Sequence, residues 1–180
     1  MPRIVIEDFF DGAQRRIDRL GLSDIMDETR KIVTDWQLTV LEQRGANGGG
    51  ALRELLDARF AGRKGWSMTK VGGIDWTRCA RRRGTQICIG VEVQVSARSD
   101  LVAVDLLHIN KAIRDGNIDL GVLIVPSDRL ASFLPSRFPC VSESRRMLEM
   151  ADARTIPLVF WGIEHDGPGA ALAVRGRKTL

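Results

Sequence analysis

The stretch "GVEVQVSAR", residues 90–98, predicts a β-strand in which three valines alternate with polar side chains. Successive side chains of a strand point to opposite faces, so the valines share one face while Glu92 and Gln94 share the other. An antiparallel strand with one solvated face has the same alternation, and a surface glutamate needs no function. The surrounding sequence has to decide whether this polar face is solvated or covered.

The flanking segments predict a hairpin that leads into two crossover units. "GGIDWTR" (72–78) and "QICIGVEVQVS" (86–96) are expected strands joined by an arginine-rich turn. The remaining expected elements are a helix over 100–116, an apolar strand over 119–125, a helix over 142–153 capped by Ser142, and a strand over 156–163. This order predicts an α/β fold, with a mixed β-sheet and helices on both sides. The polar face of residues 90–98 therefore need not be solvated.

The N-terminal part is expected to be helical. Ser23 is the expected N-cap of a helix that reaches about Gln43, and "RGANGGG" (44–50) separates it from a second helix over 51–61. At 180 residues, of which 44% are apolar, the chain is expected to form one domain. Its expected parts are N-terminal helices over 1–50, a core over 51–165 and a tail over 166–180.

Composition argues against a membrane-spanning, secreted or zinc-binding protein. The chain has no run of 18 apolar residues and no signal-peptide pattern, which favours a cytoplasmic protein. Cys79, Cys88 and Cys140 are odd in number and unpatterned, so we expect ordinary thiols and neither a zinc site nor a disulfide framework.

The basic residues are mostly arginine, and the net charge is +4. They gather in "TRCARRRGT" (77–85) and in "RGRK" (175–178). This distribution fits phosphate contacts with a nucleic acid, and equally a solvated hairpin and a solvated tail.

Asp75 lies seventeen positions before Glu92, and the expected hairpin folds the two back toward each other. Two carboxylates held close together repel unless a cation lies between them. Oxygen ligands of this kind suit Mg²⁺, which also accepts phosphate oxygens. The spacing therefore predicts a magnesium site that acts on a phosphate.

These residues resemble a known family. "GGID", which ends at Asp75, "EVQ" at residues 92–94, and the helix and buried strand that follow resemble the PD-(D/E)XK nuclease core. The resemblance is to the variant found in BglII-type restriction endonucleases, where glutamine replaces the usual lysine, and it spans residues 70–165. It implies a Type II enzyme that cuts double-stranded DNA at a short palindrome, with a restriction-endonuclease-like core.

The resemblance implies roles for single residues. Asp75 and Glu92 would ligate one or two Mg²⁺ ions, the carbonyl of Val93 would complete the metal site, and Gln94 would take the third catalytic position. An amide has no useful protonation equilibrium near neutral pH, so Gln94 can orient a water but cannot act as a base.

Contacts with DNA are expected from Ser96, Arg98 and Lys70. Ala97 stands where the family would have asparagine, so the recognition sequence of better-known relatives does not carry over. Glu54 is either an accessory acid or a helix-surface residue. The two histidines, His108 and His165, are left out of the expected site because neither has a metal-ligand partner four residues on.

Symmetry implies the partners. Both strands of a palindrome are most simply cut by a two-fold homodimer, for which the N-terminal helices are the expected surface, and a cognate DNA methyltransferase would act on the same site. Two alternatives stay open: a DNA repair or recombination nuclease with the same core, and a DNA-binding module without catalysis.

Overall fold

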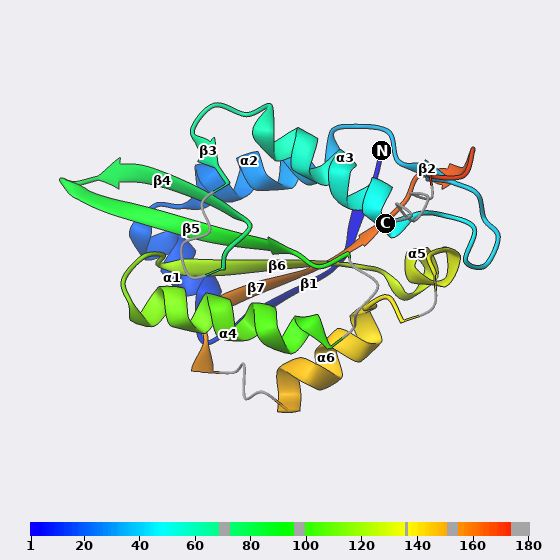
Figure 1. The fold of residues 1–180 in the computed structure, drawn as a ribbon. Coiled ribbons are helices and arrows are strands. Elements are labelled where there is room, and N and C mark those ends of the chain that lie inside the picture. The colour runs from blue at the N-terminus through cyan, green and yellow to red at the C-terminus, as the bar shows by residue number, and fades with distance from the viewer. Residues whose placement is uncertain (69–72, 96–99, 136, 151–154, 174–180) are drawn as a thin grey trace, which may run out of the picture.

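The computed structural model describes residues 1–68, 73–95, 100–135, 137–150 and 155–173. Its main feature is a mixed six-stranded sheet in the order β1-β7-β6-β5-β4-β3 (Figure 1). The strands of this sheet are β1 (Arg3–Phe10), β3 (Trp66–Ser67), β4 (Trp76–Arg82), β5 (Thr85–Val93), β6 (Leu120–Pro126) and β7 (Leu158–Glu164). A second, two-stranded sheet pairs β2 (Thr39–Val40) with β8 (Gly167–Pro168).

Three neighbouring strands, β5, β6 and β7, run parallel, while β1 and β4 pair antiparallel at either side of them. The crossovers between the parallel strands are made by helices, as parallel pairing requires. The predicted α/β class with a mixed sheet is therefore confirmed. The carboxyl ends of β5, β6 and β7 meet at one edge of the sheet, which is where ligands bind in open sheets of this kind.

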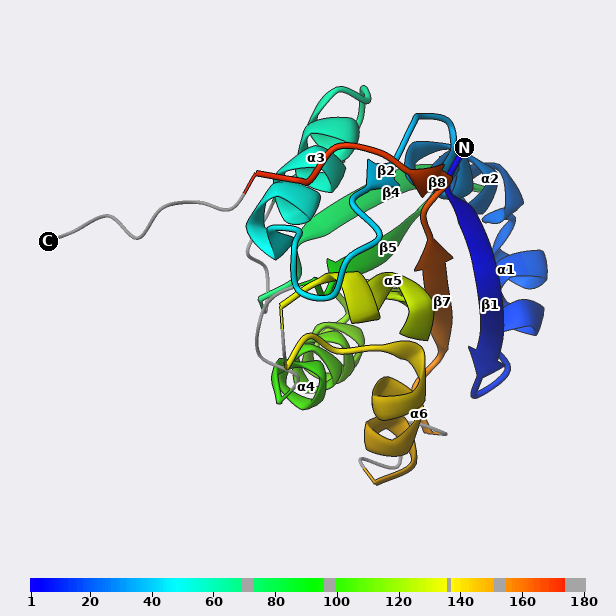
Figure 2. The same ribbon diagram turned by 90° about the vertical axis from the view of Figure 1, so that its right-hand side faces the viewer.

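Helices cover both faces of the sheet (Figures 1 and 2). The helices are α1 (Ala13–Leu20), α2 (Ser23–Thr34), α3 (Gly49–Ala61), α4 (Leu101–Arg114), α5 (Asp128–Phe133) and α6 (Val141–Met150). One apolar cluster joins α1, α2 and α3 to a face that includes Val91 and Val93, and the other joins α4 and α6 to the opposite face, which includes Leu123. The polar face of β5 is thus covered by α4, and the solvated-strand alternative is wrong.

The N-terminal part differs from the expectation in two elements. The alternating stretch "RIVIEDFF" forms the half-exposed strand β1, which we had not assigned. The helix that begins at Ser23 ends at Thr34 and not near Gln43, because the indole N–H of Trp36 donates to the carbonyl of Val33 at 2.7 Å and occupies an acceptor of the last turn.

The segment between β6 and β7 also differs. Ser127 caps α5, a helix that we had not assigned, by accepting a hydrogen bond from the backbone N–H of Leu130 at 2.9 Å. Ser142 is not an N-cap, because α6 begins at Val141 and the Ser142 hydroxyl donates to Asp128 at 2.6 Å.

The tail is described as far as residue 173. Its first residues form β8. Leu172 then contacts the loop before α3, since its carbonyl accepts from the backbone N–H of Gly48 at 3.0 Å and its N–H donates to Asn47 Oδ1 at 3.1 Å. Figure 2 shows this segment running past α3. Among the described residues, no helix is long and apolar enough to cross a membrane.

The predicted hairpin is confirmed, but the expectation of three free thiols is wrong. The β4–β5 register sets Cys79 opposite Cys88, and the two form a disulfide, which leaves Cys140 as a free cysteine. Pairs opposite each other in adjacent strands are close enough for such a bond. Strand register decides this pairing, and cysteine spacing alone does not reveal it.

Breaking this disulfide should destabilise the domain. The bond closes a loop of sequence separation 9, and the chain entropy removed from the unfolded state corresponds to about 2–3 kcal/mol. We expect the free energy of unfolding in urea to fall by that amount in a Cys79→Ala/Cys88→Ala variant. Cys140→Ala is the control, and an equal loss in that variant would remove the disulfide as the cause.

Candidate metal centre

The hairpin brings Asp75 and Glu92 together at the carboxyl edge of the sheet. Trp76 pairs with Val91 in the β4–β5 register, so one further step in each strand sets Asp75 opposite Glu92. The backbone N–H of Val93 donates to Asp75 Oδ2 at 2.9 Å and holds this carboxylate at the end of β5. Facing residues of an antiparallel pair lie side by side on one face of the sheet.

Glu92 contributes to a cluster with two residues of α4. Asp105 and His108 are three positions apart on this helix and therefore share a face, and α4 covers the face of β5 that carries Glu92. One ligand atom from each of Glu92, Asp105 and His108 lies within 4.8 Å of the others, so the three side chains can hold a metal ion together.

The polar atoms of this cluster lack hydrogen-bond partners. Glu92 is only 2% exposed, and its Oε1 lies 3.7 Å from His108 Nδ1. Among the described residues, neither of these two enclosed atoms has a hydrogen-bond partner. Leaving a buried carboxylate oxygen unpaired is costly unless the group takes up a proton or binds a cation.

The acids of the cluster repel one another. Burial, followed by repulsion from Asp75, raises the pKa of Glu92 to about 11. Burial and the charge of Asp75 likewise raise the pKa of Asp105 to about 7. A divalent cation among these groups would reverse both shifts, because it stabilises the ionised carboxylates.

Asp75 is neutralised by an arginine from the other side of the sheet. Arg53, on α3, donates through Nη2 to Asp75 Oδ1 at 2.6 Å and through Nη1 to the carbonyl of Val93 at 2.9 Å. Its Nε donates to Asp57 at 2.8 Å, and Asp57 in turn accepts from the indole of Trp76 at 2.9 Å. Burial alone would lower the pKa of Arg53, but these two carboxylates raise it above its ordinary value.

Most of the residues expected at the site meet at this edge. Asp75, Glu92, Val93 and the buried Gln94 lie together at the end of the hairpin, and the backbone N–H of Gln94 donates to the carbonyl of Ile124 at 2.8 Å. Ser96, Arg98 and Lys70 lie outside the described residues. Glu54 lies on α3, next in sequence to Arg53, and is exposed.

Sequence reasoning missed Arg53, Asp105 and His108. His108 was set aside because it has no ligand four positions on, although Asp105, three positions before it, shares its helical face. That spacing was the available signal for both α4 residues. Nothing in the sequence of α3 pointed to Arg53, since arginine is common on helix surfaces.

Gly73 is required for the placement of His108. Gly73 has a φ of +94°, and a Cβ there would lie 2.5 Å from His108 Nδ1. We expect Gly73→Ala to lower the free energy of unfolding by about 1–3 kcal/mol through backbone strain. It should also weaken Mn²⁺ binding by about tenfold, because the imidazole has to move.

Both effects can be measured by urea unfolding and by calorimetric titration. The control is Gly50→Ala in α3, where an added Cβ meets nothing within 4 Å and φ is unstrained. This control should be neutral or slightly stabilising. Unchanged Mn²⁺ affinity in Gly73→Ala would show that the placement of His108 does not depend on Gly73.

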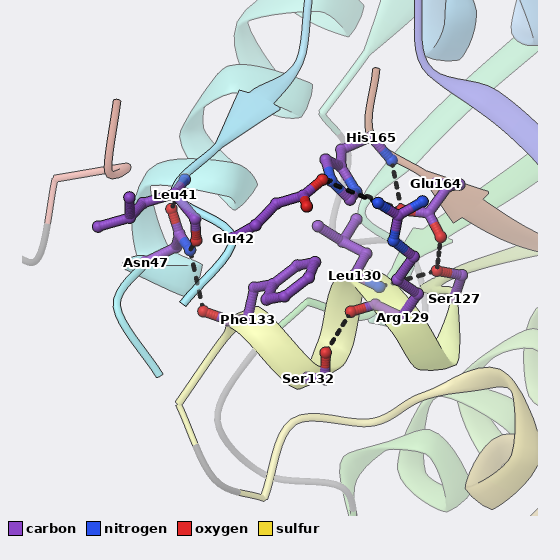
Figure 3. Close-up of polar contacts among 10 residues, drawn as sticks. All are labelled: Leu41, Glu42, Asn47, Ser127, Arg129, Leu130, Ser132, Phe133, Glu164 and His165. Atoms are coloured by element: carbon purple, nitrogen blue, oxygen red, sulfur yellow. Dashed lines mark hydrogen bonds and ion pairs between the residues drawn. The ribbon is translucent and has the colours of Figure 1, made fainter. Parts of the chain in front are cut away.

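A second polar cluster lies at the same edge of the sheet, after β6 and β7 (Figure 3). His165 is buried between two acids: its Nδ1 contacts Glu164, and its Nε2 lies 2.9 Å from Glu42. Ser127 donates to the other oxygen of Glu164 at 2.7 Å, and Arg129 donates to Glu42 at 2.9 Å. The side chains of this cluster are hydrogen-bonded to one another and join three segments, whereas the Glu92 cluster has buried atoms without hydrogen-bond partners among the described residues.

No protein-family model and no curated protein sequence matches this chain.

Proposed function

We propose that this protein is a metal-dependent nuclease that hydrolyses phosphodiester bonds in double-stranded DNA at a short palindromic site, as a Type II restriction endonuclease of the BglII type does. The observation that carries the proposal is the buried Glu92 carboxyl group, whose Oε1 has no hydrogen-bond partner among the described residues and which is set beside Asp105 and His108 and opposite Asp75. Acidic groups around a divalent ion, at the carboxyl edge of a mixed sheet, are suited to phosphate chemistry.

Each residue then has a defined task. Glu92, Asp105 and His108 would hold the ion, which supplies a water of lowered pKa and neutralises charge on the phosphate. Asp75 is held in place beside Glu92, because Arg53 and the Val93 N–H donate to its two oxygens. Gln94, two residues after Glu92 on the same face of the strand, would orient the attacking water by hydrogen bonding.

The ligands bear on which metal is bound. Mg²⁺ is the ion expected from the two carboxylates. The imidazole of His108 adds a nitrogen ligand, which Mn²⁺ accepts more readily than Mg²⁺ does. We therefore propose that Mg²⁺ supports the reaction and that Mn²⁺ binds more tightly.

The partners follow from the reaction. We propose double-stranded DNA contacted by Ser96, Arg98 and Lys70, a homodimer with one centre in each subunit, and a methyltransferase that protects the same site. In the arginine-rich hairpin, Arg78 pairs with Glu28 at 3.4 Å and Arg82 pairs with Asp24. Part of its positive charge is thus neutralised within the protein, which favours the catalytic proposal over a binding module that uses this hairpin.

The test is incubation of the full-length protein with unmethylated plasmid and phage DNA in Mg²⁺, Mn²⁺ or EDTA. Discrete fragments that depend on the metal, and that are lost in Asp75→Ala and Glu92→Ala, would support the proposal, and sequencing of the ends would give the cut site. Cleavage of branched or damaged DNA alone would indicate a repair nuclease. Retention of DNA without cleavage of any substrate would indicate a binding module.

A further inference from the structure

We propose that Arg53 permanently takes the place of a second metal ion, so that the centre binds a single divalent ion and Asp75 is not one of its ligands. This inference rests on the metal centre of the proposed function and states how many ions it holds. Arg53 is then a positioning residue, which holds Asp75 and the end of β5 as a cation would.

The contacts of Arg53 are those that a cation would make here. Its guanidinium bridges an oxygen of Asp75 and the carbonyl of Val93, at 2.6 and 2.9 Å. On its third side, the guanidinium donates through Nε to Asp57 Oδ2 at 2.8 Å. The indole N–H of Trp76 in turn donates to Asp57 Oδ1 at 2.9 Å. A planar group held on three sides is pre-organised, so a metal would have to displace several charge-assisted hydrogen bonds at once.

The Val93 carbonyl has no lone pair left for a metal. A carbonyl oxygen has two lone pairs. One accepts from Arg53 at 2.9 Å, and the other accepts from the backbone N–H of Val95 at 3.2 Å. Each oxygen of Asp75 also accepts a hydrogen bond, one from Arg53 and one from the N–H of Val93, so both oxygens are already oriented by protein donors.

Glu92 is in the opposite situation. Its Oε1 is buried and has no hydrogen-bond partner among the described residues, and it faces His108 Nδ1 at 3.7 Å. Within the described part of the chain, the side chains with ligand atoms close enough to share a metal are those of Glu92, Asp105 and His108, and Asp75 is not among them. The two halves of the site thus differ: one already contains its cation, and the other has a carboxyl oxygen and an imidazole nitrogen without hydrogen-bond partners among the described residues.

The charges at the site also favour one metal ion on the α4 side and none on the Arg53 side. Four carboxylates interact at this edge, those of Asp57, Asp75, Glu92 and Asp105, and Arg53 compensates one of their charges. One divalent ion on the α4 side would compensate two more. A second ion on the Arg53 side would have to bind beside a fixed guanidinium, where like charges repel.

The experiment counts bound Mn²⁺ by electron paramagnetic resonance of the free ion, with full-length protein at pH 8 and without DNA. We expect one Mn²⁺ per chain in the wild type and none in Glu92→Gln. Asp75→Asn should still bind one Mn²⁺, with an affinity within about threefold of the wild type, because Asp75 is not a ligand. Loss of a true ligand would weaken binding by more than about tenfold.

Arg53→Met is the complementary variant. It frees Asp75 and the Val93 carbonyl, and we expect it to gain a second, weaker Mn²⁺ site. Arg59→Met is its matched control on the same helix, where the arginine contacts the carbonyl of Asp35 at 2.8 Å, and it should bind one ion as the wild type does. If Arg53→Met does not fold, as judged by circular dichroism, the Mn²⁺ titration of Asp75→Asn alone tests whether Asp75 is a ligand.

Four results would overturn the inference. Two ions bound to the wild type, or a tenfold loss of affinity in Asp75→Asn, would show that the metal displaces Arg53, and the proposed nuclease would stand. A folded Arg53→Met variant that still binds one ion would show that the Arg53 side is no cation site. No binding by the wild type would remove the metal centre itself, and with it the proposed function.

Discussion

Replacing Glu92 with glutamine is expected to remove divalent-metal binding and metal-dependent cleavage of DNA together, while the fold is kept. Glutamine has nearly the same shape but no negative charge, and it leaves the ion with Asp105 and His108 alone. Changes around metal ligands typically weaken binding by about 10- to 100-fold, so loss of a ligand itself should cost at least the upper figure. Calorimetric titration with Mn²⁺ and a plasmid cleavage assay would measure both losses.

The matched control is Glu149→Gln, an exposed glutamate on α6. It removes the same charge away from the metal centre and should leave Mn²⁺ affinity and cleavage unchanged. Full Mn²⁺ affinity in Glu92→Gln would refute the assignment of Glu92 as a ligand. If Glu92→Gln keeps its Mn²⁺ affinity but loses cleavage, Glu92 takes part in the cleavage reaction without being a metal ligand.

The stability of the metal-free protein should fall as the pH rises, and Glu92 should be a main cause. Its pKa is raised from the ordinary value of 4.5 to about 11 in the folded protein, so the folded state binds more protons than the unfolded state between these values. The stability associated with this group is complete below pH 4.5 and is lost progressively as the pH rises toward about 11. A difference of one bound proton changes the free energy of unfolding by about 1.4 kcal/mol per pH unit.

This dependence can be separated from that of other groups by comparison with Glu92→Gln. Without metal at pH 8, the variant should melt about 3 °C or more above the wild type, because its side chain is neutral at every pH. Mn²⁺ should raise the melting temperature of the wild type more at pH 8 than at pH 5.5, since the ion binds the ionised carboxylates. Parallel curves of melting temperature against pH for the two proteins would contradict a buried, protonated Glu92.

Local pattern was enough to predict the hairpin and the approach of its two acids. Alternation with period 2 identified the strand that carries Glu92, and the seventeen-residue separation set Asp75 across from it. The edge strand β1 was missed although its burial alternates, because nothing within residues 3–10 says which strand they pair with. The Cys79–Cys88 disulfide was missed for the related reason that register, and not spacing, decides the pairing.

The sequence by itself determined the α/β class, the hairpin, and the position of Glu92 on the polar face of a strand. These features depend on side-chain periodicity and turns, which act over a few neighbouring residues. Only the tertiary structure decided which side chains surround Glu92. Apolar packing of α4 against one face of the sheet brings Asp105 and His108 to it, and packing of α3 against the other face brings Arg53 to Asp75. The rotation of a helix about its own axis depends on the surface it packs against, so residues distant in sequence come together only when the layers assemble.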